Sequence, residues 1–319
     1  MARAAAAFAL EARASTAPMS ADEMIEALRR FDVIVATLGD AFSEEIFARA
    51  EAAGPIRCRL LANFGVGYNH IDAAAAARRG ILVTNTPGAV TDATADIAIA
   101  LMLMSTRRAA EGERLVRSGR WQGWHPTQML GLHVTGKTIG IIGMGRIGKA
   151  IARRAHYGFL MRVVFANRSP LADPGVPGAR QLGIDEVMAT ADVIAVAVPG
   201  GPATRHLIDA RRIALMRPHA HLINISRGDV IDEAALIEAL EAKRIGGAGL
   251  DVYEHEPEVP ARLRALDNAV LLPHLGTAAL EVRTAMGMMA LDNVEAFLAG
   301  RRPPNPVPEA AELAAALPG

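Results

Sequence analysis

The sequence predicts an α/β protein of two domains, each built on a largely parallel sheet. Three observations lead to this fold class. The chain has 319 residues, about twice the length of an average domain. Short runs of β-branched residues alternate with helical patterns, as expected when helices cover both faces of a parallel sheet. A glycine-rich turn, residues 143–148, separates a predicted strand from a predicted helix.

The first half of the chain begins with residues 1–10, which have the composition of a helix. Three strands are then predicted, at residues 31–37, 59–64 and 81–85. Short helices are predicted between them, beginning near Ser43 and Asp72. One long helix is predicted from about residue 91 to residue 117, and it leads into an irregular segment, residues 118–131, that contains both tryptophans. We interpret this helix and segment as the connection between the domains.

The second half repeats the alternation of strands and helices from Lys137 onward. The predicted strands are residues 138–145, 161–166, 192–198, 221–226, 246–253 and 268–274, the last of which closes the sheet. The predicted helices are residues 146–156, 232–243 and 278–299. Asp232 is well placed to cap the second of these helices, and Gly300 ends the third.

The composition excludes several classes of protein. The 34 basic residues are balanced by 34 acidic ones, whereas nucleic-acid-binding proteins usually carry a basic excess or a basic face. Cys58 is the only cysteine, so a disulfide within the chain and a cysteine-cluster metal site are excluded. The longest apolar stretch, around residues 95–104, is too short to cross a bilayer. We expect a cytoplasmic protein without a nucleic-acid or membrane partner.

The glycine-rich turn predicts a dinucleotide site. Gly143 permits the tight turn, Gly145 lets the backbone approach a pyrophosphate, and Gly148 lets the helix pack closely against the strand. The helix N-terminus adds amide donors and a positive dipole. A phosphate-binding loop of a nucleotide hydrolase is the alternative, since the GxxxxGK pattern also matches. Ala150 occupies the position where that loop needs a hydroxyl for magnesium, which disfavours the alternative.

The end of the next predicted strand bears on the choice of cofactor. Proteins that bind NAD usually place a carboxylate there for the ribose 2′-hydroxyl. The sequence instead has Asn167, Arg168 and Ser169. An arginine suits a 2′-phosphate, so NADP is the preferred cofactor and NAD the second choice. A solvated arginine without a role at the strand end is the competing interpretation.

Three later strands end in polar groups that suit the reduction of a 2-oxo acid. Arg227, Glu256 and His274 follow strands of one predicted sheet, and ligands of such sheets bind beyond the carboxyl ends of the strands. Arg227 can hold a carboxylate or carbonyl oxygen through a forked pair of hydrogen bonds. His274 can protonate the carbonyl oxygen, and Glu256 can orient the imidazole and favour its charged form.

Taken in their order along the chain, these motifs resemble those of the D-isomer-specific 2-hydroxyacid dehydrogenase family. The resemblance is greatest to its glyoxylate/hydroxypyruvate reductase branch. The resemblance extends from about residue 20 to residue 306. The matching runs are NFGVGYNHID (63–72), GILVTNTPGAVTDATADIA (80–98), GKTIGIIGMGRIGKAIARR (136–154) and the later SRG, DVYEHEP and PHLGTA segments.

The resemblance implies two Rossmann-like, doubly wound domains and a role for each matching residue. The substrate domain is discontinuous, residues 1–101 and 284–319, and residues 102–283 form the dinucleotide-binding domain. The family's catalytic residues correspond to Arg227, Glu256 and His274. Its substrate loop corresponds to Val66 and Gly67, whose backbone amides bind the substrate with Arg227 and His274. Its further cofactor contacts correspond to Arg146, Ile147, Pro199, Ser226, Asp251 and Gly276.

The resemblance also implies a homodimer and no metal. Trp121 and Trp124 lie in a segment that reaches a neighbouring subunit's active site in the family, and packing in the core is an equal alternative for them. The family normally begins with a strand where this chain has a helical composition. A chain that starts late would leave the substrate-domain sheet one strand short, with an exposed edge.

The predicted activity is the reduction of glyoxylate or hydroxypyruvate to the D-2-hydroxy acid, by hydride transfer with His274 as proton donor. Another 2-oxo acid reductase of the same family is the first alternative. A non-catalytic, dinucleotide-sensing protein similar to the family's transcriptional corepressors is the second.

Overall fold

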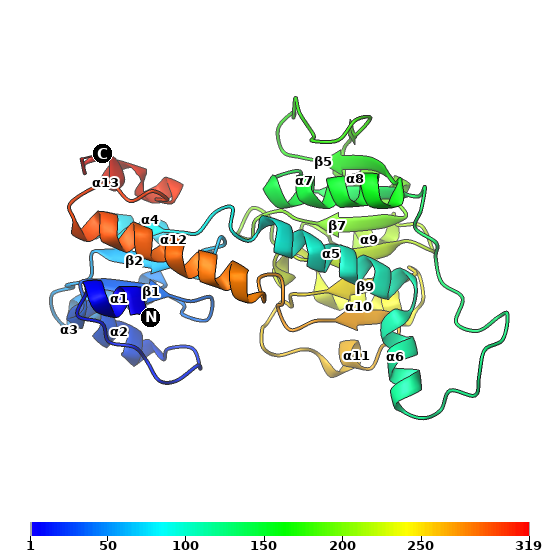
Figure 1. Ribbon diagram of the computed structural model, residues 1–319, viewed down its shortest axis with the longest axis horizontal. Coiled ribbons are helices and arrows are strands. Elements are labelled where there is room, and N and C mark those ends of the chain that lie inside the picture. The colour runs from blue at the N-terminus through cyan, green and yellow to red at the C-terminus, as the bar shows by residue number, and fades with distance from the viewer. Residues whose placement is uncertain (1, 319) are drawn as a thin grey trace. The chain divides into compact units, whose positions relative to one another are not determined.

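The computed structural model describes residues 2–318. The chain divides into two compact units (Figure 1). The first unit combines the residues up to Val90 with those from Leu280 onward, and the second is Thr91–Ala279. Each unit contains a parallel β-sheet with helices packed against it, which confirms the predicted fold class.

The boundaries of the units differ from those expected, which lay after residues 101 and 283. Both expected boundaries would cut a continuous helix, α5 (Thr91–Thr106) or α12 (Leu280–Leu298). The buried side chains of α5 pack as a group in the core of the second unit, with strand residues such as Ile139 and Ile141. The division therefore lies before α5 and before α12.

The sheet of the first unit has three parallel strands in the order β1-β2-β3. The strands are β1 (Val33–Ala36), β2 (Leu60–Asn63) and β3 (Leu82–Thr84), and each lies within a predicted range. All four residues of the central strand β2 are buried, as expected for a parallel sheet covered on both faces. Besides α12, the helices are α1 (Ala2–Ala7), α2 (Ala21–Arg30), α3 (Glu44–Ala53), α4 (Ala73–Arg78), the 3₁₀-helix η3 (Pro308–Ala310) and α13 (Ala311–Ala315).

Side-chain caps explain where three of these helices begin. Ser20, Ser43 and Asp72 each accept a hydrogen bond from a backbone N–H in the first turn of α2, α3 and α4, respectively. Such a cap contributes about 1 kcal/mol relative to alanine. The starts near Ser43 and Asp72 were predicted. Helix α2 was not, although Ser20 and Glu23 form a capping box that the sequence displays.

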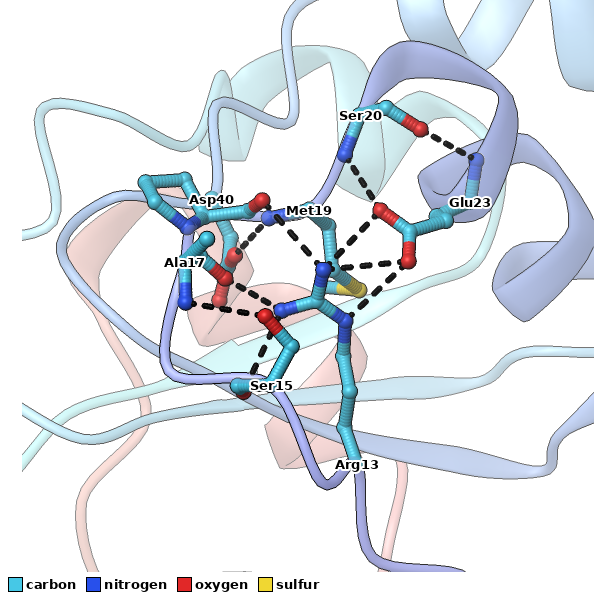
Figure 2. Close-up of polar contacts among 8 residues, drawn as sticks. Arg13, Ser15, Ala17, Met19, Ser20, Glu23 and Asp40 are labelled. Atoms are coloured by element: carbon cyan, nitrogen blue, oxygen red, sulfur yellow. Dashed lines mark hydrogen bonds and ion pairs between the residues drawn. The ribbon is translucent and has the colours of Figure 1, made fainter.

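Arg13 fixes the segment that precedes α2 (Figure 2). Its guanidinium donates to both carboxylate oxygens of Glu23, from Nε to Oε1 at 3.2 Å and from Nη2 to Oε2 at 3.1 Å. The other end of the segment is held by the buried Asp40, which accepts from the backbone N–H of Met19 at 3.0 Å. These contacts join the segment to α2 and to the loop after β1.

The sheet of the second unit has seven parallel strands in the order β10-β9-β8-β7-β4-β5-β6. They are β4 (Thr138–Ile142), β5 (Arg162–Ala166), β6 (Arg180–Gln181), β7 (Val193–Val196), β8 (His221–Asn224), β9 (Gly247–Leu250) and β10 (Ala269–Leu271). The strand order reverses between β4 and β7, and ligands of doubly wound sheets bind beyond the strand ends at that point. The predicted final strand, β10, does lie at one edge, while the short edge strand β6 was not predicted.

The helices of the second unit connect these strands. Besides α5, they are α6 (Ala109–Arg117), α7 (Arg146–Arg153), the π-helix η1 (Arg154–Gly158), α8 (Ile184–Thr190), α9 (Ala210–Ala214), the 3₁₀-helix η2 (Gly228–Val230), α10 (Glu233–Glu241) and α11 (Ala261–Arg264). Asp232 caps α10 through the backbone N–H of Ala235 at 3.0 Å, as the sequence predicts. None of the helices in residues 2–318 is long and apolar enough to cross a membrane.

The single long helix predicted for residues 91–117 is wrong. The structure has two helices, α5 and α6, separated at Arg108, whose φ of 54° is left-handed. The backbone N–H of Leu132 donates to the carbonyl oxygen of Thr106 at 2.7 Å. That carbonyl would otherwise accept from an amide four residues on. The chain that crosses the end of α5 therefore ends this helix, and a distant contact of this kind leaves no local signal in the sequence.

Candidate active site

The turn between β4 and α7 has the geometry that its three glycines predict. Gly143 has a φ of 98°, a conformation that glycine adopts without steric cost. A Cβ on Gly148 would lie 2.2 Å from the carbonyl oxygen of Gly143, so only glycine lets α7 pack against the turn. At Gly145, apart from the glycine itself and its two neighbours in the chain, no atom of the described residues lies within 4 Å of the position of a Cβ. This open space fits the close approach of a dinucleotide pyrophosphate.

Helix α7 presents its N-terminus at this turn. In contrast to α2, α3 and α10, it receives no hydrogen bond from a capping side chain. The first amides of a helix and its positive dipole favour an anion at this end. Arg146 is exposed and Ile147 is half-buried in this first turn. The chemistry of the site therefore suits a phosphate group.

The chain beyond β5 carries the residues expected at the ribose. Asn167, Arg168 and Ser169 are all exposed, and no acid lies among them. Gln181 on β6 holds this segment, because its Nε2 donates to the carbonyl oxygens of Asn167 at 3.3 Å and Ser169 at 3.1 Å. Its Oε1 accepts from the backbone N–H of Leu171 at 3.0 Å. The backbone at Arg168 is therefore braced, while its side chain is exposed to solvent.

Two further predicted cofactor contacts lie beyond β7 and β8. Ser226 is buried, and its hydroxyl donates to the carbonyl oxygen of Val198, which joins the segments after the two strands. Pro199 lies next to that contact, and its carbonyl oxygen accepts from the hydroxyl of Thr204 at 2.7 Å. Both residues therefore shape the backbone at the strand ends, and their contact with a cofactor remains a prediction.

Arg227 lies on a turn that Asn224 folds. The side-chain oxygen of Asn224 accepts from the backbone N–H of Ser226 at 3.0 Å, and its Nδ2 donates to the carbonyl oxygen of Arg227 at 2.9 Å. Burial lowers the pKa of the Arg227 guanidinium, and the charges of Glu256 and Asp229 oppose this shift. Arg227 is half-buried, and arginine keeps its charge in proteins. The turn therefore presents a cation near the Glu256 carboxylate.

Glu256 and His274 are in direct contact. Oε2 of Glu256 lies 2.9 Å from Nδ1 of His274, and its Oε1 accepts from the backbone N–H of Tyr253 at 3.1 Å. Burial raises the pKa of the Glu256 carboxyl, but the hydrogen bond and charge of His274, the N–H of Tyr253 and the charge of Arg227 together outweigh burial, and the net shift is downward. A carboxylate on Nδ1 fixes the orientation of the ring and leaves Nε2 to act on another group.

Asp251 organises the loop that carries His274. The buried carboxylate of Asp251 accepts from the backbone N–H groups of Leu275 at 2.6 Å and Gly276 at 2.7 Å. The carbonyl oxygen of Asp251 accepts from the backbone N–H of His274 at 3.0 Å. His274 has a left-handed φ of 54°, which is rare outside glycine and costs about 1–3 kcal/mol. The three contacts hold the loop in this conformation.

The predicted substrate loop lies in the first unit, directly after β2. Val66 and Gly67 are half-buried there. Their carbonyl oxygens accept from the side-chain amides of Asn85 at 2.9 Å and Asn63 at 3.0 Å, respectively. Within residues 2–318, no acceptor is bonded to the N–H of Val66 or Gly67. Both N–H groups are thus available to a ligand.

Four residues that support these sites were not predicted: Asn63, Asn85, Gln181 and Asn224. Each uses its side-chain amide to hold backbone groups of a segment that carries predicted site residues. Asn63 and Asn224 are the last residues of β2 and β8, and an asparagine at the end of a buried strand is a signal that could have identified them. Gln181 has no comparable signal, because its contacts depend on the pairing of β6 with β5.

Comparison with known proteins agrees with this geometry. Residues 99–276 match the family model described as D-isomer specific 2-hydroxyacid dehydrogenase, NAD binding domain. The chain is 44% identical to a glyoxylate reductase of Pyrococcus furiosus over 288 residues, which cover 89% of this chain and 84% of that protein. The chain belongs to the D-isomer specific 2-hydroxyacid dehydrogenase family.

Solved structures of this family have the same fold. A glyoxylate reductase from Paecilomyes thermophila superimposes with a TM-score of 0.81 at 34% identity, covering 91% of this chain and 88% of that chain. An NADPH-dependent glyoxylate/hydroxypyruvate reductase from Sinorhizobium meliloti, solved with NADP and malonate, gives 0.81 at 36% identity with the same coverage. This family member is therefore an oxidoreductase that uses a nicotinamide dinucleotide to reduce a 2-oxo acid to the 2-hydroxy acid.

Proposed function

We propose that the preferred substrates are glyoxylate and hydroxypyruvate, which the enzyme reduces to the achiral 2-hydroxy acid glycolate and to a D-2-hydroxy acid, respectively. The observation that carries this proposal is the Glu256–His274 pair, with Arg227 close enough for its charge to act on Glu256. The names of the similar proteins support the same substrate class.

In the proposed reaction the bound dinucleotide supplies the hydride. Arg227 binds a carboxylate or carbonyl oxygen of the substrate through its forked N–H donors. His274 gives the proton on Nε2 to the carbonyl oxygen while Glu256 stabilises the charged imidazole through Nδ1. The backbone amides of Val66 and Gly67 bind the substrate carboxylate.

We propose NADPH as the preferred cofactor and NADH as the second choice. The exposed Arg168 can pair with a 2′-phosphate, and the segment around it contains no carboxylate that would repel one. Gln181 supports this proposal because it fixes the backbone on both sides of Arg168.

We further propose that the enzyme works as a homodimer in the cytoplasm. Trp121, Trp124 and Leu130 have exposed fractions of 50%, 79% and 68% in the segment between α6 and β4. Large apolar side chains that gather on a surface are typical of contacts between proteins. The homodimer is tested by the molar mass of the purified protein in solution, before and after Trp124→Ser.

A panel assay tests the proposed substrates. The purified protein is given NADPH or NADH with glyoxylate, hydroxypyruvate, pyruvate and a bulky 2-oxo acid, and the loss of reduced nicotinamide is recorded. We expect the highest kcat/KM with glyoxylate or hydroxypyruvate and NADPH, and His274→Ala serves as the inactive control. Higher efficiency with the bulky acid would assign a different substrate. Dinucleotide binding without turnover of any 2-oxo acid would instead indicate a dinucleotide-sensing protein.

A further inference from the structure

The loop after β2 has three successive carbonyl oxygens that are all held by other groups. Nδ2 of Asn63 donates to the carbonyl oxygens of Gly65 and Gly67, each at 3.0 Å. Nδ2 of Asn85 donates to the carbonyl oxygen between them, that of Val66, at 2.9 Å. The two side-chain amides therefore fix three neighbouring peptide units with their oxygens toward the protein.

This arrangement determines where the N–H groups of the loop point. In a planar trans peptide the C=O and N–H bonds point in opposite directions. Because the oxygens of these units are bonded to Asn63 and Asn85, the N–H groups of Val66, Gly67 and Tyr68 point away from these two side chains. Within the described chain no acceptor is bonded to these three groups. Successive backbone N–H groups presented on one side form a concavity that binds anions.

Asn63 and Asn85 are themselves held in place. Asn63 is buried, with 1% of its surface exposed, and Asn85 contacts Asn293, which is 0% exposed. Asn293 on α12 donates from Nδ2 to the carbonyl oxygen of Asn85 at 3.3 Å, and its Oδ1 accepts from the backbone N–H of Asn305 at 2.9 Å. The backbone N–H of Asn85 donates to the carbonyl oxygen of Asn305 at 3.1 Å. The position of Asn85 is therefore set from both sides.

A buried atom of Asn63 indicates that this residue positions the loop and does not simply stabilise the fold. Oδ1 of Asn63 is buried and has no hydrogen-bond partner among the described residues. A buried polar atom without a partner is destabilising and uncommon. Both hydrogens of the same side chain are nevertheless used on the loop. The residue thus serves the shape of the loop at a cost to the stability of the fold.

We propose that Asn63 and Asn85, with Asn293 behind Asn85, are positioning residues that hold the Gly65–Gly67 backbone in its anion-binding conformation. The anion is the carboxylate of the 2-oxo acid, so this proposal rests on the proposed function. These side chains do not touch the substrate. They act through the backbone that does.

The test separates substrate affinity from turnover. Loss of a neutral hydrogen bond changes an equilibrium constant by up to about tenfold. For Asn85→Ala we therefore expect the KM for glyoxylate to rise about tenfold, with kcat and the KM for NADPH unchanged. The inhibition constant of oxamate, an unreactive carboxylate analogue, should rise in parallel. A rise in KM at constant kcat is typical of lost binding that is equal in the ground and transition states.

Asn63→Asp and Asn268→Ala complete the experiment. Asn63→Asp keeps the size of the side chain but replaces its donors with an oxygen, so we expect a larger rise in KM than for Asn85→Ala. Asn268 also donates its amide to a carbonyl oxygen, that of Leu240 at 3.1 Å, but lies in the second unit. Asn268→Ala is the matched control and should leave the KM for glyoxylate unchanged.

Each outcome decides the matter. An active wild type whose KM for glyoxylate is unchanged by Asn85→Ala would overturn the positioning role and leave the proposed function intact. A fall in kcat at constant KM would overturn it too. A wild type that reduces no 2-oxo acid would refute the proposed function, and with it the role of the loop. If Asn63→Asp fails to fold, the half-buried Asn85 still gives the answer.

Discussion

The contact between Glu256 and His274 gives the sharpest test of the proposed mechanism, through the substitution Glu256→Gln. Glutamate uses both oxygens here, one for Nδ1 of His274 at 2.9 Å and one for the N–H of Tyr253 at 3.1 Å. Glutamine offers a single oxygen and no charge. A hydrogen bond to a charged group contributes about 1.5–3 kcal/mol, against about 0.5–1.5 kcal/mol for a neutral one. The side chain of Glu256 is 36% exposed, and screening by solvent reduces the difference to about 1 kcal/mol.

This magnitude sets the expected change in the pH profile. His274 must carry a proton to act as an acid, so we expect kcat for reduction to fall at high pH. The lowered pKa of Glu256 means that this carboxylate is charged over the working range and favours the protonated imidazole. Since about 1.4 kcal/mol corresponds to one pH unit, Glu256→Gln should move the half-fall of kcat to lower pH by somewhat less than one unit. At a pH above the half-fall, kcat should drop several-fold.

The assay is kcat with saturating glyoxylate and NADPH across the pH range, for the wild type, Glu256→Gln and Glu258→Gln. Glu258 is an exposed acid on the same turn, so its variant controls for a general change in charge. A half-fall at the same pH in the wild type and in Glu256→Gln would refute the role of Glu256 in stabilising the charged imidazole. A shift of equal size in both variants would assign the effect to the surface field rather than to the contact.

The remaining predictions concern other parts of the site. His274→Ala should lower kcat by about 10²–10⁴-fold while the Kd of the dinucleotide changes little, and near-normal turnover would remove His274 from the mechanism. Arg227→Lys should raise the KM for glyoxylate and lower kcat together, since lysine lacks the fork; unchanged kinetics would contradict the assignment. Arg168→Ala should reduce kcat/KM with NADPH by about ten- to a hundredfold and leave NADH use unchanged, whereas Asn167→Asp should shift preference toward NADH. A wild type that prefers NADH would show that Arg168 is only a solvated charge. Asp251→Asn replaces one of two acceptor oxygens and should lower the free energy of unfolding by about 1–3 kcal/mol, measured by urea unfolding; an unchanged value would show that the loop does not depend on both contacts.

The sequence predicts the parts of this fold that depend on local patterns. Buried β-branched runs locate the strands, and Ser43 and Asp72 mark where two helices begin. The pairing of Glu256 with His274 can also be predicted from the sequence, because parallel strands bring their carboxyl ends to one edge of the sheet. Each of these inferences needs only a few adjacent residues and the rules of sheet geometry.

Contacts between distant segments could not be predicted in the same way. The helix break at Arg108 depends on the backbone N–H of Leu132, which donates to the end of α5. The residues near position 108 contain no pattern that predicts this break. Gln181 reaches the carbonyl oxygens of Asn167 and Ser169 only because β6 pairs with β5. Asp251 matches a motif that suggests a cofactor contact, yet both of its carboxylate oxygens accept from the loop of His274. A motif indicates that a residue matters, but its partners decide which task it performs.

The two units share a solution to one physical problem, which is to order the irregular segment that follows a buried strand. In each unit an asparagine ends a buried strand and uses its amide to fold the segment that follows: Asn63 after β2 and Asn224 after β8. A carboxylate or amide side chain can form hydrogen bonds with several backbone groups at once. The rigid strand that precedes it fixes the position of its Cα atom. The free energy needed to hold the loop amides after β2, or Arg227 after β8, then comes from buried hydrogen bonds rather than from the substrate. Substrate binding then does not have to supply the free energy that orders these segments.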